Sequence, residues 1–271
     1  MNYLKLTHFE LRRVMPFFLS AIGLFALIQF TLVFFYQRRL YKFLSEELRS
    51  GGTIETFALD WGPISLFSLA NTSPFYIGSF LLIFATTIGY SLFIWYRDWF
   101  GKHLFIYRLL LMPVHRMTIY SAKFSAIVVM LLALVASQLV FIPLQTQLLT
   151  MNLPNQLIEP ASFSLLYSAN WLFGPAFSME VQASLTISLL ALLLFSLFLI
   201  VLLERSFRLK GIFIAIAYLA TVGGISIALL LFLNRFLYLS ELYVVTLILC
   251  LLFSALAIVL SFYLLVKKIT V

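Results

Sequence analysis

Residues 96–123 read YRDWFGKHLFIYRLLLMPVHRMTIYSAK and form the most basic interval of the chain. They carry five lysines and arginines against one acid, Asp98, and they lie between two long apolar segments. Short loops of membrane proteins that are rich in Lys and Arg stay on the cytoplasmic side, because basic residues next to a span resist translocation. The interval therefore predicts a cytoplasmic loop between two membrane spans.

The centre of this loop predicts a short helix over residues 102–112. No helix breaker lies between Gly101 and Met112, and Pro113 then ends the helical run, because proline disfavours helical backbone in the residue before it. Nearly all faces of this helix are apolar, so it would be unstable if it were fully solvated. We expect either the ends of the neighbouring spans or a partner protein to cover it.

The composition excludes an ordinary soluble domain. Of the 271 residues, 63% are apolar and 10% are charged, and the mean hydropathy is +1.07, whereas soluble domains are about one quarter charged. The net charge of +8 could suit a nucleic-acid-binding protein. The basic residues lie at the ends of apolar segments, however, so membrane topology explains them and we expect no nucleic-acid partner.

The pattern predicts an all-α integral membrane protein in which the whole chain, 1–271, forms a single transmembrane permease domain. We expect six spans, at residues 16–36, 74–95, 124–149, 181–203, 212–233 and 242–266. Pro143 is expected to kink the third span or to end it early. The outer loops would be 37–73 and 150–180, with both termini cytoplasmic. This layout places 13 of the 18 lysines and arginines on the inner side.

Several kinds of chemistry are missing from the sequence. It contains no GxxxxGK[ST] phosphate-binding loop, and its three histidines show no pair at metal-ligand spacing. The spans as drawn hold no Asp, Glu, Lys, Arg or His, which carriers driven by ion gradients use as relays. We therefore expect no catalytic residue, no metal site and no enzyme activity in this chain. Cys250 is expected to be a small buried apolar residue.

Two glutamines within the spans, Gln29 and Gln138, are the candidates for lining a transport pathway. A primary amide in a lipid environment needs a hydrogen-bond partner, and a transported molecule could provide one. The alternative is that each amide joins two helices of the same protein.

Residues 109–123, LLLMPVHRMTIYSAK, resemble the segment between the second and third spans of ABC-2-type exporter permeases. In that family apolar residues are followed by Pro-x-x-Arg, then an aliphatic residue and a lysine that opens the third span. Pro113, Arg116, Ile119 and Lys123 fit this pattern. The resemblance implies that the cytoplasmic helix is a coupling helix that docks on a separate ATPase subunit. It implies ATPase-coupling roles for Arg97, Tyr107, Arg108, Leu110, Pro113 and Arg116.

The resemblance further implies the membrane subunit of an ATP-driven exporter in a bacterial cell membrane. Its partners would be ABC ATPase subunits, a second copy or a homologous permease, and membrane lipid. ATP and Mg would bind the partner subunit, so this chain would hold no cofactor. The apolar spans suit an amphipathic peptide, a lipid-like molecule or a drug as substrate. Two alternatives stay open, a non-transporting sensor or immunity subunit and a secondary carrier.

Overall fold

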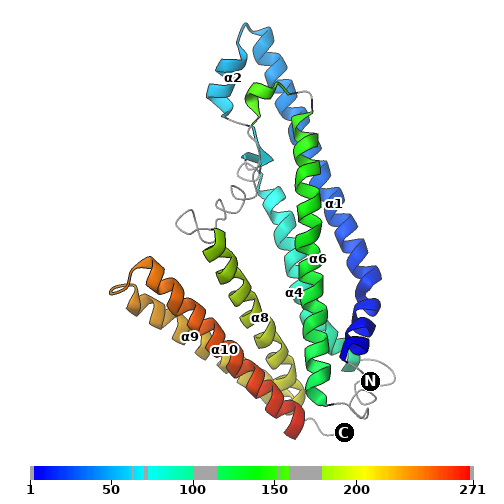
Figure 1. Ribbon diagram of the computed structural model, residues 1–271, viewed down its shortest axis with the longest axis vertical. Helices are drawn as coiled ribbons and strands as arrows, with labels where there is room; N and C mark the ends of the chain where they lie inside the picture. The colour runs from blue at the N-terminus through cyan, green and yellow to red at the C-terminus, as the bar shows by residue number, and fades with distance from the viewer. Residues whose placement is uncertain are drawn as a thin grey trace. The chain divides into compact units, whose positions relative to one another are not determined.

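The computed structural model describes residues 3–62, 64–66, 68–69, 73–99, 115–151, 153–158 and 179–268. Throughout these residues the architecture is helical, and six helices are long and apolar enough to cross a membrane (Figure 1). The prediction of an all-α, multi-pass membrane protein with six spans is therefore confirmed. The predicted coupling helix, 102–112, lies outside the described residues.

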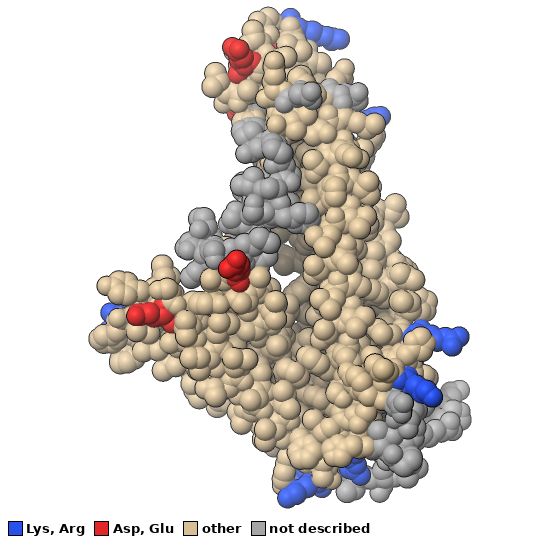
Figure 2. Space-filling view, viewed as in Figure 1, with Lys and Arg blue, Asp and Glu red and all other residues tan. Residues whose placement is uncertain are grey.

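The six candidate spans contain the six predicted segments and extend beyond most of their ends. They are α1 (Tyr3–Arg49), α4 (Pro74–Trp99), α6 (Arg116–Thr150), α8 (Met179–Phe207), α9 (Leu209–Leu233) and α10 (Leu239–Lys267). Two short helices, α2 (Ile54–Trp61) and the 3-10 helix η1 (Asn155–Leu157), lie in the segments predicted as outer loops. On the face shown in Figure 2, charged side chains lie mainly at helix ends and uncharged residues cover the helices between them.

α1 is longer than a single membrane crossing requires. Its 47 residues correspond to about 70 Å of helix, whereas the hydrocarbon core of a bilayer is about 30 Å thick. Residues 37–49, which we expected to open the outer loop, continue the helix. The helix ends at Arg49, and Gly51 follows with a φ of +90°, a conformation that glycine adopts without strain just after a helix C-terminus.

Pro143 does not end the third span. It lies inside α6, which continues to Thr150. Of the two expected effects of this proline, a kink or an early end, the early end was therefore wrong. Neighbouring helices and side chains in membrane proteins satisfy backbone groups that a proline leaves free, so prolines are tolerated in spans.

Contacts divide the chain into two compact units. Unit 1 comprises residues 1–11, 87–127 and 180–271, and unit 2 comprises residues 12–86 and 128–179. In unit 1, the rings of Trp95, Tyr120 and Phe198 pack edge to face or tilted against one another, with centroids 5.3 to 6.2 Å apart. This aromatic group joins α4, α6 and α8 beside the charged residues described below.

Unit 2 has a separate apolar core that includes both predicted outer loops. Phe57 of α2, Ile64, and Leu153 and Leu157 near η1 are buried together with residues of α1 and α6. The Ile64 amide donates a hydrogen bond to the Leu157 carbonyl oxygen at 2.8 Å, and Gln37 Nε2 donates to the Met151 carbonyl oxygen at 2.8 Å. The loops after α1 and α6 therefore pack on each other, as expected of loops on the same side of a membrane.

Candidate functional site

Four charged side chains of unit 1 converge from three helices. Glu10 belongs to α1, Arg97 and Asp98 to the last turn of α4, and Lys123 to α6. We call these four residues the charge cluster. Its side chains are 1% exposed or less except for Arg97, which is 15% exposed.

Lys123 is the centre of the charge cluster. Its Nζ donates hydrogen bonds to Glu10 Oε1 at 2.9 Å, to Asp98 Oδ2, and to the Ile94 carbonyl oxygen at 3.1 Å. An ammonium group has three donors, so these acceptors satisfy all of them. The ring centroid of Trp95 lies 5.3 Å from the same nitrogen. Lys123 therefore connects the N-terminal part of α6 to both α1 and the end of α4.

Arg97 connects the opposite side of the Glu10 carboxylate to α4. Its Nη2 donates to Glu10 Oε2 at 2.7 Å, and its Nη1 donates to Tyr90 Oη at 2.6 Å. Each carboxylate oxygen of Glu10 thus accepts a hydrogen bond from a different cation. Charge-assisted hydrogen bonds are stronger than neutral ones, so Glu10 holds α4 and α6 against α1.

The electrostatics of the charge cluster explain why these groups tolerate burial. Two carboxylates face two cations, so their formal charges cancel. Moving ions out of water is costly, and only good geometry with additional hydrogen bonds offsets that cost. Removing one member would leave an unpaired buried charge, at a cost of about 3–5 kcal/mol. The charge cluster can therefore fix the relative positions of three helix ends.

Sequence reasoning missed this arrangement. Glu10 carries no role in the sequence analysis, Asp98 enters it only as the one acid of the basic interval, and Lys123 enters it through the permease pattern. A usable signal was present, because each of the two acids stands alone among basic residues at the end of a predicted span. An acid that stands alone among basic residues at a helix end is a candidate ion-pair partner for a neighbouring helix.

Arg116, a predicted coupling residue, contacts the C-terminal end of α10. Its Nη1 donates a hydrogen bond to the Leu265 carbonyl oxygen at 2.6 Å, and the ring of the preceding His115 stacks on Phe262. The last carbonyl groups of a helix have no partners within the helix, and a nearby cation stabilises them. Arg116 therefore has a structural contact within unit 1.

Gln29 belongs to a buried polar group in unit 2. Gln145 Nε2 donates to Gln29 Oε1 at 3.0 Å, and Tyr76 Oη donates to Gln145 Oε1 at 2.6 Å. These three side chains join α1, α4 and α6, and both glutamines are fully buried. This arrangement is the helix-to-helix contact that the sequence left open as the alternative to a pathway role.

Gln138 occupies a different environment in unit 2. It lines an apolar cavity of about 240 Å³ together with Phe25, Phe80, Leu134 and other apolar residues. Both polar atoms of its amide are buried and have no hydrogen-bond partner among the described residues. An unpaired buried amide is costly, so this position is suited to a ligand with a polar group.

The remaining predicted coupling residues, Tyr107, Arg108, Leu110 and Pro113, lie outside the described residues. The structure therefore places Arg97 in the charge cluster and Arg116 near α10, and it places the two glutamines in separate surroundings. No protein-family model matches the chain, and no curated protein or solved structure matches it.

Proposed function

We propose that this chain is the membrane subunit of an ATP-driven exporter of the ABC-2 type, which forms a transport pathway and docks a separate ATPase. The proposal combines the resemblance of residues 109–123 with the position of the charge cluster. No catalytic role is assigned to this chain, and ATP hydrolysis is assigned to the partner.

The observation that carries the proposal is that the charge cluster joins both ends of the predicted coupling segment. α4 ends at Trp99, one residue after Asp98, and α6 begins at Arg116, two turns before Lys123. The ion pair between Asp98 and Lys123 closes the chain between them, and Glu10 adds α1 to the same group. A displacement of the segment would therefore act on three helices together.

In the proposed mechanism, nucleotide-driven closure of the ATPases moves the docked segment. Buried, hydrogen-bonded charges do not separate easily, so the linked helix ends would move as a unit and change access to the pathway. The ATPase must bind the two access states with different free energy, since otherwise it could not shift their populations. The substrate class stays as the sequence suggests, an amphipathic peptide, a lipid-like molecule or a drug.

A second candidate function is a secondary carrier, and burial of Glu10 and Asp98 is the observation that favours it. Carriers coupled to protons use buried carboxylates as relays. Here, however, each carboxylate forms an ion pair with a cation. Proton uptake would have to break those ion pairs, so we favour the mechanical role.

The test is to purify the tagged full-length chain from its native host in mild detergent and to identify stoichiometric partners. An ABC ATPase that co-purifies, together with transport in proteoliposomes that stops when that ATPase is inactivated, would support the exporter. Transport that persists without any ATPase and stops when the ion gradient is collapsed would establish the carrier instead. Absence of both an ATPase partner and transport would favour the sensor or immunity subunit.

A further inference from the structure

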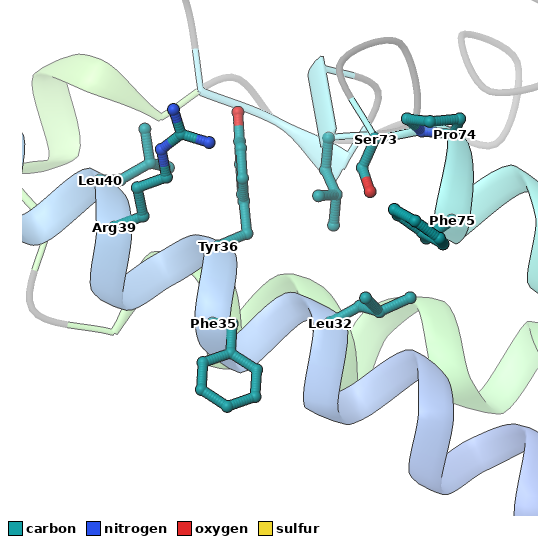
Figure 3. Close-up of a pocket in the computed structure, with 9 residues that line it drawn as sticks. Leu32, Phe35, Tyr36, Arg39, Leu40, Ser73, Pro74 and Phe75 are labelled. Atoms are coloured by element: carbon teal, nitrogen blue, oxygen red, sulfur yellow. The ribbon is translucent and has the colours of Figure 1, made fainter.

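Unit 2 contains a cavity of about 540 Å³ between α1 and the beginning of α4. Its lining residues are Leu32, Phe35, Tyr36, Arg39, Leu40, Leu69, Ser73, Pro74 and Phe75. Figure 3 shows Tyr36 and Arg39 extending from α1 in the same direction, with Ser73 and Phe75 across the cavity from them. One guanidinium and two hydroxyl groups therefore share a cavity whose other walls are apolar.

Arg39 has no acidic partner in the part of the chain that the structure describes. Its guanidinium carbon lies 5.5 Å from the ring centroid of Phe43, and no carboxylate of the described residues lies within ion-pair distance. The nearby Lys42, by contrast, pairs with Glu46 at 3.8 Å. Arg39 is thus a cation at the edge of a cavity, and the described residues around it provide no counter-ion.

The position of the cavity along α1 matches the depth of a lipid headgroup in a bilayer that α1 crosses. Residues 14–37 of α1 contain no Asp, Glu, Lys or Arg, and these 24 residues span about 36 Å, a little more than a hydrocarbon core. Arg39 follows this stretch by two residues. α4 begins its own charge-free stretch at Pro74, on the other side of the cavity. In a bilayer crossed by residues 14–37, the cavity would lie at the boundary between acyl chains and headgroups.

We propose that this cavity binds an anionic phospholipid of the surrounding bilayer. The Arg39 guanidinium would donate hydrogen bonds to the phosphate, a geometry to which its planar fork is suited. The hydroxyl groups of Tyr36 and Ser73 would donate to phosphate or glycerol oxygens, and an acyl chain would lie along Leu32 and Phe75. The volume is in the range of sites that hold small molecules.

The charge and the position of the cavity together favour a lipid over other occupants. A soluble anion would make no contact with the apolar walls, and an uncharged lipid would provide no counter-ion for Arg39. The lipid site goes beyond the proposed transport function and requires no ATPase, so it can be tested on the purified chain alone.

The experiment measures phosphatidylglycerol binding to the full-length chain in detergent by native mass spectrometry, with phosphatidylcholine as the uncharged comparison. We expect Arg39→Gln to weaken phosphatidylglycerol binding about fivefold, the effect of one basic residue near an anionic lipid. The matched control is Arg38→Gln. Arg38 carries the same charge on the adjacent residue, but it lies over the Phe34 ring at 4.6 Å and does not line the cavity.

The expected pattern is a loss with Arg39→Gln, little change with Arg38→Gln, and no difference between the two variants for phosphatidylcholine. Phe75→Ala, which shortens an apolar wall, should weaken the binding of both lipids. Equal losses from the two arginine variants would mean general surface attraction and would overturn the proposal.

Two further outcomes would assign the cavity to another occupant. If glycerol phosphate displaces phosphatidylglycerol at similar concentrations, the cavity binds a free anion and not a lipid. If Arg39→Gln leaves lipid binding unchanged but alters the molar mass measured by light scattering, a second copy of the chain covers the cavity.

Discussion

Lys123 and Asp98 lie 25 residues apart in the chain and form an ion pair in which neither side chain is more than 1% exposed. This pair closes the segment between α4 and α6, and Glu10 joins it to α1. Because a buried charge is costly without its partner, the contact restricts the distance between the two helix ends. The two helix ends that flank the basic loop are therefore held together in the folded protein.

We expect Lys123→Met to destabilise the protein by about 3–5 kcal/mol, because two carboxylates would lose their shared cation. The double variant Asp98→Asn/Lys123→Met removes one charge of each sign and should recover part of this loss. Denaturant unfolding in detergent micelles measures the free energies of unfolding of both variants and of Asp98→Asn alone. Lys5→Met is the control, because Lys5 is exposed on the same end of α1 and should change the stability by less than about 0.5 kcal/mol. Strictly additive effects of the two cluster substitutions would argue against the pair.

The buried amide group predicts a second non-additive result. Gln145→Leu leaves Gln29 Oε1 and Tyr76 Oη without partners, and we expect it to cost about 1–3 kcal/mol. Gln29→Leu/Gln145→Leu should cost less than the sum of the two single variants, because both partners of one hydrogen bond are removed together. Thermal unfolding followed by circular dichroism measures the cycle. The contact would be contradicted if the double variant lost as much unfolding free energy as the two single variants together, or more.

The coupling hypothesis predicts that Tyr107→Ala or Leu110→Ala releases the ATPase while the membrane subunit stays folded. Truncating a central anchor of an interface costs about 2 kcal/mol or more, which corresponds to roughly thirtyfold weaker binding. Pull-down of the ATPase from detergent extracts, normalised to the amount of membrane subunit, measures the effect. Leu209→Ala is the control, because Leu209 is 75% exposed in the other predicted inner turn. Reduced abundance of the variants with normal ATPase retention would show that the segment only packs under its own spans.

The predicted topology can be tested with single cysteines at positions chosen from the structure. Leu59 is 85% exposed in α2, and Gln156 is exposed in η1, so Leu59→Cys and Gln156→Cys should react with a membrane-impermeant maleimide in intact cells. Lys210→Cys, in the predicted inner turn, should react only after permeabilisation. Cys250 is buried and should stay unlabelled. Labelling of one outer position without the other would conflict with the packing of Ile64 against Leu157.

The sequence by itself determined the six helices and much of their position. α4 begins at Pro74 and α9 ends at Leu233, as predicted. Such boundaries follow from local hydropathy, because a membrane crossing needs about 20 consecutive apolar residues whose backbone groups bond within the same helix. The confinement of charge to helix ends is likewise visible in the sequence.

Only the tertiary structure decided which polar residues form ion pairs and hydrogen bonds between helices. Glu10 pairs with Lys123 over 113 residues of chain, and Gln145, which the sequence did not single out, is the partner of Gln29. A hydropathy pattern is a sum over neighbours in the chain and contains no information on which helix faces come together. For the same reason the continuation of α1 through residues 37–49 was missed, since the partners that bury Leu40 and Leu44 belong to distant segments. Helix existence is a local property of this sequence, whereas its charge cluster, its buried amide group and the cavity beside Arg39 are properties of the packed helices.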